Sequence, residues 1–164
     1  VRSLRSSAKR GVVSAERSWR HPRARLRAGA VLARRGLARA MIDLSDGLLI
    51  DAERLCAASG VAARIDADRL PLSPALRTVA PDDARALALS GGEDYELLFA
   101  VPRTRVAALQ AARASLGCPI TRIGELYRGR GVAVVAAGET MALGGRRGHE
   151  HFRGRVPERQ GTRA

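Results

Sequence analysis

The sequence has few aromatic residues and no long hydrophobic run. Aromatic side chains make up 3% of the 164 residues, whereas hydrophobic residues make up 46%, so Ala, Leu and Val must form most of the core. This hydrophobic content excludes intrinsic disorder of the whole chain and, at this length, predicts about one compact domain. The longest uncharged apolar stretch spans residues 131–138, far below the roughly 18 residues of a membrane-spanning helix. A transmembrane protein is therefore excluded.

Cysteine is also scarce, with Cys56 and Cys118 as the two examples. Neither has a second cysteine or a histidine at metal-ligand spacing. We interpret both as buried, reduced thiols of a cytoplasmic protein. A disulfide and a reactive thiol are the alternatives.

Lysine is nearly absent, because Lys9 is the single lysine among 29 basic residues. Together with 16 acidic residues they give a net charge of +13, and the excess lies at the ends of the chain. Residues 1–40 hold 12 basic residues and one acidic residue, and residues 146–164 hold six and two, whereas residues 41–145 hold 11 and 13. Trp19 is the single aromatic residue in the first basic segment, so base stacking is poorly supported. We expect only nonspecific association with nucleic acid.

The charge distribution also suggests domain limits. We predict a disordered basic extension over residues 1–20, a folded domain over 21–152 and a disordered tail over 153–164. The Ser- and Arg-rich residues 1–18 also resemble an organellar transit peptide, but they lack a clear amphipathic period.

Apolar periodicity predicts an alternation of helices and strands. A stripe that ends at Gly60, a residue suited to a left-handed C-cap, predicts a helix over residues 48–59. Further helices are predicted over about 23–35, from Asp82-Asp83 to Ser90, and from Thr104 to Leu116. Strands are predicted over residues 40–44, 61–65, 95–101, 119–123 and 131–135. The class is α+β (α/β layered), with a single mixed sheet flanked by helices.

The segment Ile42-Asp43-Leu44-Ser45-Asp46-Gly47 lies where a predicted buried strand meets a helix. On an extended backbone Asp43 and Ser45 project to the side opposite Leu44, and Asp46 enters the first helical turn. Two carboxylates near 4 Å would repel by about 4 kcal/mol at an effective dielectric constant of about 20. A divalent cation turns that repulsion into attraction, and oxygen ligands suit Mg²⁺. The alternative is that Ser45 or Asp46 merely caps the helix while Asp43 faces solvent.

A second polar cluster, Ser90-Gly91-Gly92-Glu93-Asp94-Tyr95-Glu96, precedes the apolar run Leu97-Leu98-Phe99. Paired glycines let the backbone approach a ligand closely, whereas the acidic residues would repel a bare phosphate. The cluster therefore predicts a site for a cationic or hydrogen-bond-donating group, or for a metal. A simple turn into an edge strand is the alternative.

A third cluster, Gly148-His149-Glu150-His151-Phe152, lies near the end of the chain. The His-x-His pair has no third metal ligand nearby in the sequence. A packed C-terminal anchor is therefore preferred over a metal site.

Taken in order, these segments resemble the C-terminal domain of thiamine-monophosphate kinases, in the superfamily of aminoimidazole ribonucleotide synthase. The resemblance rests on the segments MIDLSDGL (41–48), ARIDADRLPLS (63–73), ALSGGEDYELLF (88–99), IGEL (123–126) and GHEHF (148–152). It implies transfer of the γ-phosphate of ATP to thiamine monophosphate, with Mg²⁺ and without a phosphoenzyme.

The resemblance also implies roles for individual residues. Asp43 and Asp46 would bind Mg²⁺, Ser45 would contact ATP, and Glu93 would contact the thiamine substrate. His149 stands where the family has a bulky aromatic residue against that substrate. No residue is assigned as a catalytic acid, base or nucleophile.

The family further has an N-terminal ferredoxin-like domain and forms homodimers. Residues 1–20 do not replace that domain, so we expect the chain to be a fragment that is inactive alone. The alternative from another class is a non-catalytic basic module that binds nucleic acid or a protein partner on the same scaffold.

Overall fold

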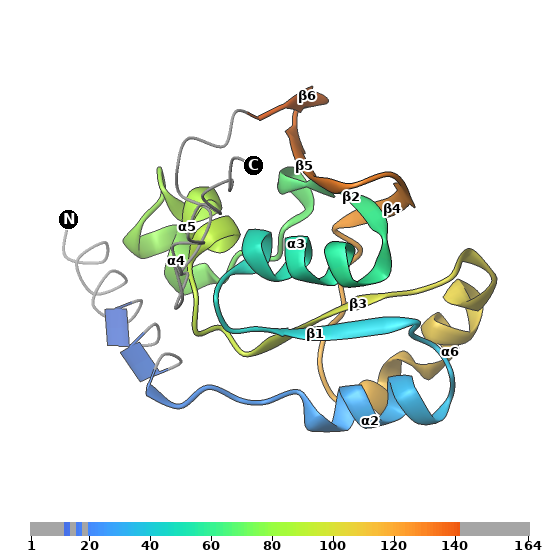
Figure 1. Cartoon of the computed structure of the whole chain (residues 1–164). Helices are drawn as coiled ribbons and strands as arrows, with labels where there is room; N and C mark the ends of the chain where they lie inside the picture. The colour runs from blue at the N-terminus through green and yellow to red at the C-terminus, as the bar shows by residue number, and fades with distance from the viewer. Residues whose placement is uncertain (1–11, 14–15, 18–19, 142–164) are drawn as a thin grey trace, which may run out of the picture.

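The computed structural model of the chain describes residues 12–13, 16–17 and 20–141 (Figure 1). Its α-helices are α2 (Leu26–Arg34), α3 (Leu48–Ser59), α4 (Pro74–Val79), α5 (Ala84–Ser90) and α6 (Val106–Leu116). Its strands are β1 (Ala40–Leu44), β2 (Val61–Asp66), β3 (Glu96–Ala100), β4 (Gly124–Arg128), β5 (Gly131–Ala136) and β6 (Glu139–Thr140). Two short 3₁₀ turns are η1 (Ala67–Arg69) and η2 (Arg103–Arg105). The predicted α+β class is confirmed.

Within the described residues the strands form two sheets, whereas the sequence predicted one. Antiparallel β1 and β3 form a two-stranded sheet, and the second sheet has the order β4-β2-β5-β6 with β2 and β5 parallel. Helix α3 packs against β1 of the first sheet and against β2 and β5 of the second. Its buried residues include Leu48, Leu49, Ile50, Ala52 and Cys56. An apolar helix surface this wide must be covered on more than one side, and the two sheets together cover it.

Strand β3 lies between two hydrophobic clusters because its side chains alternate between faces. Leu98 packs against the cluster that contains Leu48 and Leu49 of α3. Leu97 and Phe99 pack against the cluster formed by α2 and α6. In Figure 1, α3 accordingly lies on one side of the β1–β3 pair, with α2 and α6 on the other.

Strand β1 is less buried than predicted. Met41 is 37% exposed and Asp43 is also exposed, while Ala40, Ile42 and Leu44 are half-buried. Asp43 pairs with Leu97 and Met41 with Phe99, so both share the sheet face that α2 and α6 cover over β3. That cover does not extend fully over β1, which leaves Asp43 in solvent.

Several predicted element ends differ from the structure. The strand predicted over residues 119–123 is wrong, because β4 begins only at Gly124. A Cβ at Gly124 would lie 2.2 Å from the Arg64 carbonyl oxygen, so glycine is what allows β4 to pair this closely with β2. The helices predicted to start at Asp82-Asp83 and at Thr104 begin instead at Ala84 and Val106, and Thr104 lies within η2.

Both cysteines are free, with Cys56 buried and Cys118 half-buried. Burial raises the pKa of the Cys56 thiol, and the Glu53 carboxylate adds to the effect. Burial was predicted for both thiols and is confirmed for Cys56 only, while their reduced state stays a prediction. No helix in the described part of the chain is long and apolar enough to cross a membrane.

The predicted end segments are only partly covered. Of the extension at 1–20, residues 12–13, 16–17 and 20 are described, and they are helical. His149 and the tail at 153–164 lie outside the described residues. The predicted domain limits therefore stay predictions.

Candidate functional site

The two polar loops that the sequence singled out lie side by side. The backbone N–H of Tyr95 donates to the Leu44 carbonyl at 2.8 Å, and that of Glu93 donates to the Ser45 carbonyl at 2.7 Å. These bonds extend the β1–β3 ladder, in which Leu44 pairs with Glu96, into the loops. The two loops, separated by about fifty residues in the sequence, are thus joined by backbone hydrogen bonds.

Glycine is required where the loops meet. A Cβ at Gly92 would lie 2.7 Å from the Ser45 carbonyl oxygen. Gly47 has φ of 119°, and a Cβ there would lie 3.0 Å from the Ser90 carbonyl oxygen. The glycines therefore let the two backbones approach each other, whereas the sequence predicted that they approach a ligand.

Two residues other than glycine adopt left-handed backbone conformations in this region. Glu93 has φ of 67° and Tyr95 has φ of 50°. A left-handed conformation costs about 1–2 kcal/mol for an L-residue with a side chain. Such strain concentrates at functional sites, where the surrounding structure holds it in place. The flanking hydrogen bonds of Glu93 and Tyr95 supply that restraint.

The first loop is organised by Asp51, a residue that sequence reasoning missed. Its side chain is 1% exposed, and one carboxylate oxygen, Oδ2, accepts the backbone N–H groups of Ser45, Asp46 and Gly47 at 3.1, 3.0 and 3.2 Å. The other oxygen, Oδ1, accepts Nη1 of Arg54 at 2.9 Å. A charged residue within the apolar stripe of α3 was the signal that could have identified it, because carboxylates are rarely buried without partners.

Asp46, a predicted Mg²⁺ ligand, is also largely buried, with 9% of its surface exposed. Its Oδ2 forms an ion pair with Arg54 of α3. The other predicted ligand, Asp43, is exposed on β1. The structure therefore places the two carboxylates in different environments. Among the described residues, no three Asp, Glu, His or Cys side chains gather into a group that could hold a metal.

Of the alternative for this loop, the exposure of Asp43 is confirmed, whereas the capping of α3 by Ser45 or Asp46 is wrong. The N-cap of α3 is Gly47, which has no side chain. Neither Ser45 nor Asp46 occupies the N-cap position, and the N–H groups of the loop point to Asp51 instead.

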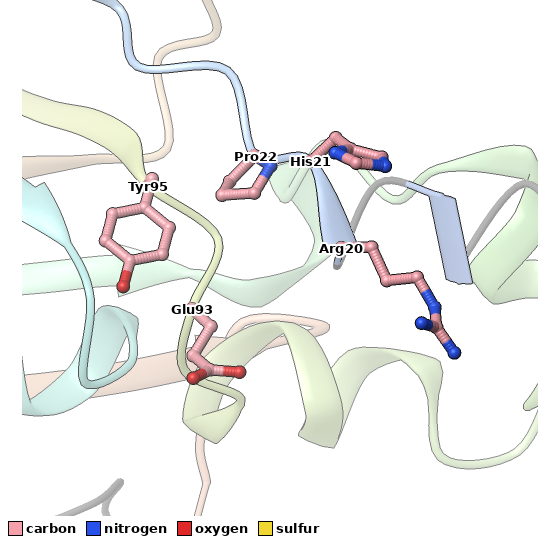
Figure 2. A pocket seen from close by; sticks show the side chains of 5 residues that line it. All are labelled: Arg20, His21, Pro22, Glu93 and Tyr95. Carbon is pink, nitrogen blue, oxygen red and sulfur yellow. The ribbon is translucent and has the colours of Figure 1, made fainter.

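Glu93 and Tyr95 line a pocket of about 500 Å³ together with Arg20, His21 and Pro22. Figure 2 shows Glu93 and Tyr95 on the loop before β3 and the other three residues on the segment before α2. Tyr95 is 40% exposed. The pocket thus has an acidic and aromatic wall and a basic wall, which suits a ligand that carries both charges.

An ion pair outside the pocket lining joins the two segments that carry these walls. Arg25, just before α2, donates from Nε to Oε2 of Glu96 at 2.7 Å, and its Nη2 contacts Oε1. Desolvation raises the pKa of Asp94, and repulsion from the Glu96 carboxylate raises it further.

The chain is an α+β domain in which a strand–loop–helix unit carrying Ser-Asp-Gly is joined to a Gly-Gly-Glu-Asp loop. It belongs to the family described as AIR synthase related protein, C-terminal domain, which matches residues 5–137. The curated relatives of this chain include a thiamine-monophosphate kinase from Escherichia coli O157:H7, 46% identical over 120 residues, which cover 72% of this chain and 37% of the relative. The chain thus spans a little over a third of that relative.

Solved structures show the same relationship. The thiamine-monophosphate kinase from Stenotrophomonas maltophilia K279a is 47% identical and matches with a TM-score of 0.58 over 67% of this chain and 34% of its own. AaThiL complexed with AMPPCP and TMP is 33% identical and matches with a TM-score of 0.58 over 76% of this chain and 37% of its own.

Proposed function

We propose that this chain forms the C-terminal part of a thiamine-monophosphate kinase, which phosphorylates thiamine monophosphate to thiamine diphosphate with ATP. The observation that carries the proposal is the hydrogen bond from Glu93 N–H to the Ser45 carbonyl, because it joins the proposed ATP loop to the proposed acceptor loop. A relative complexed with AMPPCP, an analogue of ATP, and with TMP supports the same pair of ligands. The catalytic power would come from positioning the two phosphates and neutralising their charge.

The roles proposed for individual residues are those that the family resemblance implies, and the positions of Ser45 and Glu93 support them. Ser45, half-buried in the loop held by Asp51, would contact ATP. Glu93, at the pocket, would contact the cationic thiamine end of the acceptor. His149 stays a predicted substrate contact outside the described residues.

Asp43 and Asp46 would hold Mg²⁺, which neutralises charge on the transferred phosphate when bound. Mg²⁺ in such enzymes usually has one or two carboxylate ligands, waters and substrate phosphate oxygens. Two aspartates suit that donor set. The ion pair of Asp46 with Arg54 must be rearranged for Asp46 to take this role.

The proposal also concerns the parts of the enzyme beyond this chain. The chain spans 37% of its E. coli relative, and we propose that an N-terminal domain completes the site and that the chain alone is inactive. On the family resemblance, we further propose that the complete enzyme is a cytoplasmic homodimer. No feature of the described residues favours the alternative of a basic interaction module.

The test is a fusion of the whole chain to the N-terminal portion of the E. coli relative, assayed for thiamine diphosphate. Glu93→Gln should raise the KM for thiamine monophosphate about tenfold, equivalent to about 1.4 kcal/mol, and leave the KM for ATP unchanged. Glu139→Gln, at an exposed acid of β6, is the matched control. A folded fusion without activity, or equal effects of the two substitutions, would contradict the proposal.

A further inference from the structure

The two walls of the pocket belong to segments that are distant in the sequence. Residues 20–22 form the basic wall, and Glu93 with Tyr95 forms the acidic and aromatic wall (Figure 2). Arg25 follows the first wall, and Glu96 directly follows the second. Their side chains meet in a bidentate contact, in which Nε of Arg25 donates to Oε2 of Glu96 at 2.7 Å and Nη2 contacts Oε1. The pair therefore joins the segments that form the walls, although it does not line the pocket.

Both partners of this pair are anchored in regular structure. Glu96 is the first residue of β3 and pairs with Leu44 of β1. The carbonyl of Arg25 accepts the N–H of Gly29 in α2 at 2.9 Å. A Cβ at Gly29 would lie 3.8 Å from Cδ2 of Leu97, so this part of α2 packs on β3. The ion pair thus connects two points whose positions the fold already determines.

The basic wall itself has less support from the fold. Residues 22–25 have no regular secondary structure, and residues 21–24 are exposed, so packing contributes little to their position. The Arg25 side chain is 29% exposed, less than its neighbours before α2. A bidentate arginine–carboxylate contact fixes orientation as well as distance. The pair therefore determines where the exposed segment leaves α2, and with it the position of the basic wall.

Each wall suits one end of a ligand that carries both charges. Tyr95 presents an aromatic side chain that is 40% exposed, and Glu93 adds a carboxylate, which together suit a cation. Arg20 on the opposite wall pairs with Glu16 at 2.8 Å in an exposed contact. A guanidinium has several N–H donors, enough for an anion in addition. A ligand of this kind must reach both walls at once, so the spacing of the walls matters for its binding.

We propose that Arg25 and Glu96 are positioning residues that set the spacing of the two walls for a ligand with one cationic and one anionic end. This inference rests on the proposed function, whose acceptor, thiamine monophosphate, carries both charges. Its cationic end would lie at Glu93 and Tyr95, and its phosphate at the basic wall. A wall that is held in place before binding loses less conformational entropy when the ligand binds.

The experiment titrates the isotope-labelled whole chain with thiamine monophosphate and with thiamine, and follows the amide NMR signals of Glu93 and Tyr95. The native chain should bind thiamine monophosphate more tightly, because thiamine has no phosphate to reach the basic wall. Arg25→Gln should weaken thiamine-monophosphate binding about tenfold, within the usual range of coupling between two sites, and leave thiamine binding unchanged. An equal loss for both ligands, no loss, or no binding of thiamine monophosphate by the native chain up to millimolar concentration would overturn the inference.

A second set of variants distinguishes positioning from direct contact with the ligand. If the pair acts as a unit, Glu96→Gln should cause the same loss as Arg25→Gln, and the double variant should lose no more than either one. Additive losses, or a loss from Arg25→Gln alone, would show that Arg25 itself contacts the ligand and would overturn the inference. Arg122→Gln is the matched control, because Arg122 pairs with Glu125 where both side chains are exposed. It should leave both affinities unchanged.

Arg25→Lys covers the case in which Arg25→Gln does not fold. Lysine keeps the charge opposite Glu96 but lacks the planar fork of donors. Its affinity for thiamine monophosphate should fall by a smaller factor, and an unchanged affinity would contradict the inference. These titrations do not depend on turnover. A folded fusion that makes no thiamine diphosphate would therefore contradict the proposed function, while the titrations would still decide whether the pair positions the walls.

Discussion

Asp51 Oδ2 accepts a hydrogen bond from the backbone N–H of Asp46 at 3.0 Å, so one aspartate fixes the loop that carries the other. The same oxygen accepts the N–H groups of Ser45 and Gly47. A carboxylate that accepts several N–H groups is a strong acceptor, because each bond is charge-assisted. The position of the proposed ATP and metal ligands therefore depends on a buried residue that is not itself a proposed ligand.

Replacement of Asp51 should destabilise the domain. Asp51→Asn removes the charge opposite Arg54 and weakens the acceptor for three N–H groups, so we expect a loss of about 3 kcal/mol in the free energy of unfolding. Urea denaturation measures it. Glu125→Gln, in the exposed pair with Arg122, is the control and should change stability by less than about 1 kcal/mol. Similar effects of the two substitutions would show that Asp51 does not organise the loop.

Gly92 should not tolerate a side chain. Gly92→Ala places a Cβ against the Ser45 carbonyl oxygen, at 2.7 Å before any shift, and should cost about 1–3 kcal/mol as overpacking does. Gly29→Ala is the matched control, because its nearest contact would be 3.8 Å away within helix α2. That change should be neutral or stabilising by up to about 1 kcal/mol. Thermal unfolding of both variants decides, and a Gly92→Ala variant as stable as the control would contradict the close approach of the loops.

Replacement of the strained residue Glu93 should have opposite effects on stability and on substrate binding. Glu93→Gly removes the left-handed strain at φ of 67° and should raise stability by up to about 1 kcal/mol. It also removes the proposed acceptor contact, so thiamine-monophosphate affinity in the fusion should fall. Calorimetric unfolding and substrate titration measure the two effects. A less stable variant that still binds substrate normally would refute both assignments.

The Asp94 carboxyl group should make stability depend on pH. Its folded-state pKa is raised by desolvation and by Glu96, so ionisation of Asp94 opposes folding. Its stabilising contribution is complete below the unfolded-state pKa and is lost as pH rises through the folded-state pKa. Asp94→Asn should therefore be more stable than the native chain at pH 7, and this advantage should shrink at acidic pH. An advantage that does not change between pH 7 and pH 3 would show that ionisation of Asp94 does not oppose folding.

Local signals predicted most elements of the fold. The apolar stripe and Gly60 identified α3, and Gly60 is left-handed with φ of 65°. Strand β1 was predicted with its observed limits. The strand at 119–123 was wrong because apolar content alone did not reveal that pairing with β2 starts at Gly124. The division into two sheets depends on contacts of α3 with distant strands, which periodicity along the chain does not encode.

The sequence predicted the two loops of the candidate site, but it did not predict that they lie side by side or that Asp51 holds the first loop. The residue types of Ser45, Asp46 and Glu93 identified both loops. Their adjacency arises from pairing of β1 with β3, a nonlocal contact. Asp51 was missed because a charged pair on a helix usually lies in solvent, so its position among apolar residues of α3 was the one local signal, and tertiary packing is what buries it.

The most direct test of the central claim is the turnover of Asp46→Asn in the fusion with the N-terminal portion of the E. coli relative. If Asp46 is a metal ligand where phosphate charge is neutralised, thiamine diphosphate formation should fall by about a hundredfold or more, an electrostatic effect of about 3 kcal/mol, and the Mg²⁺ requirement should rise. If Asp46 is only part of the loop structure, stability should fall by about 1 kcal/mol, as for loss of a helix cap, with turnover intact. The second result would contradict the account.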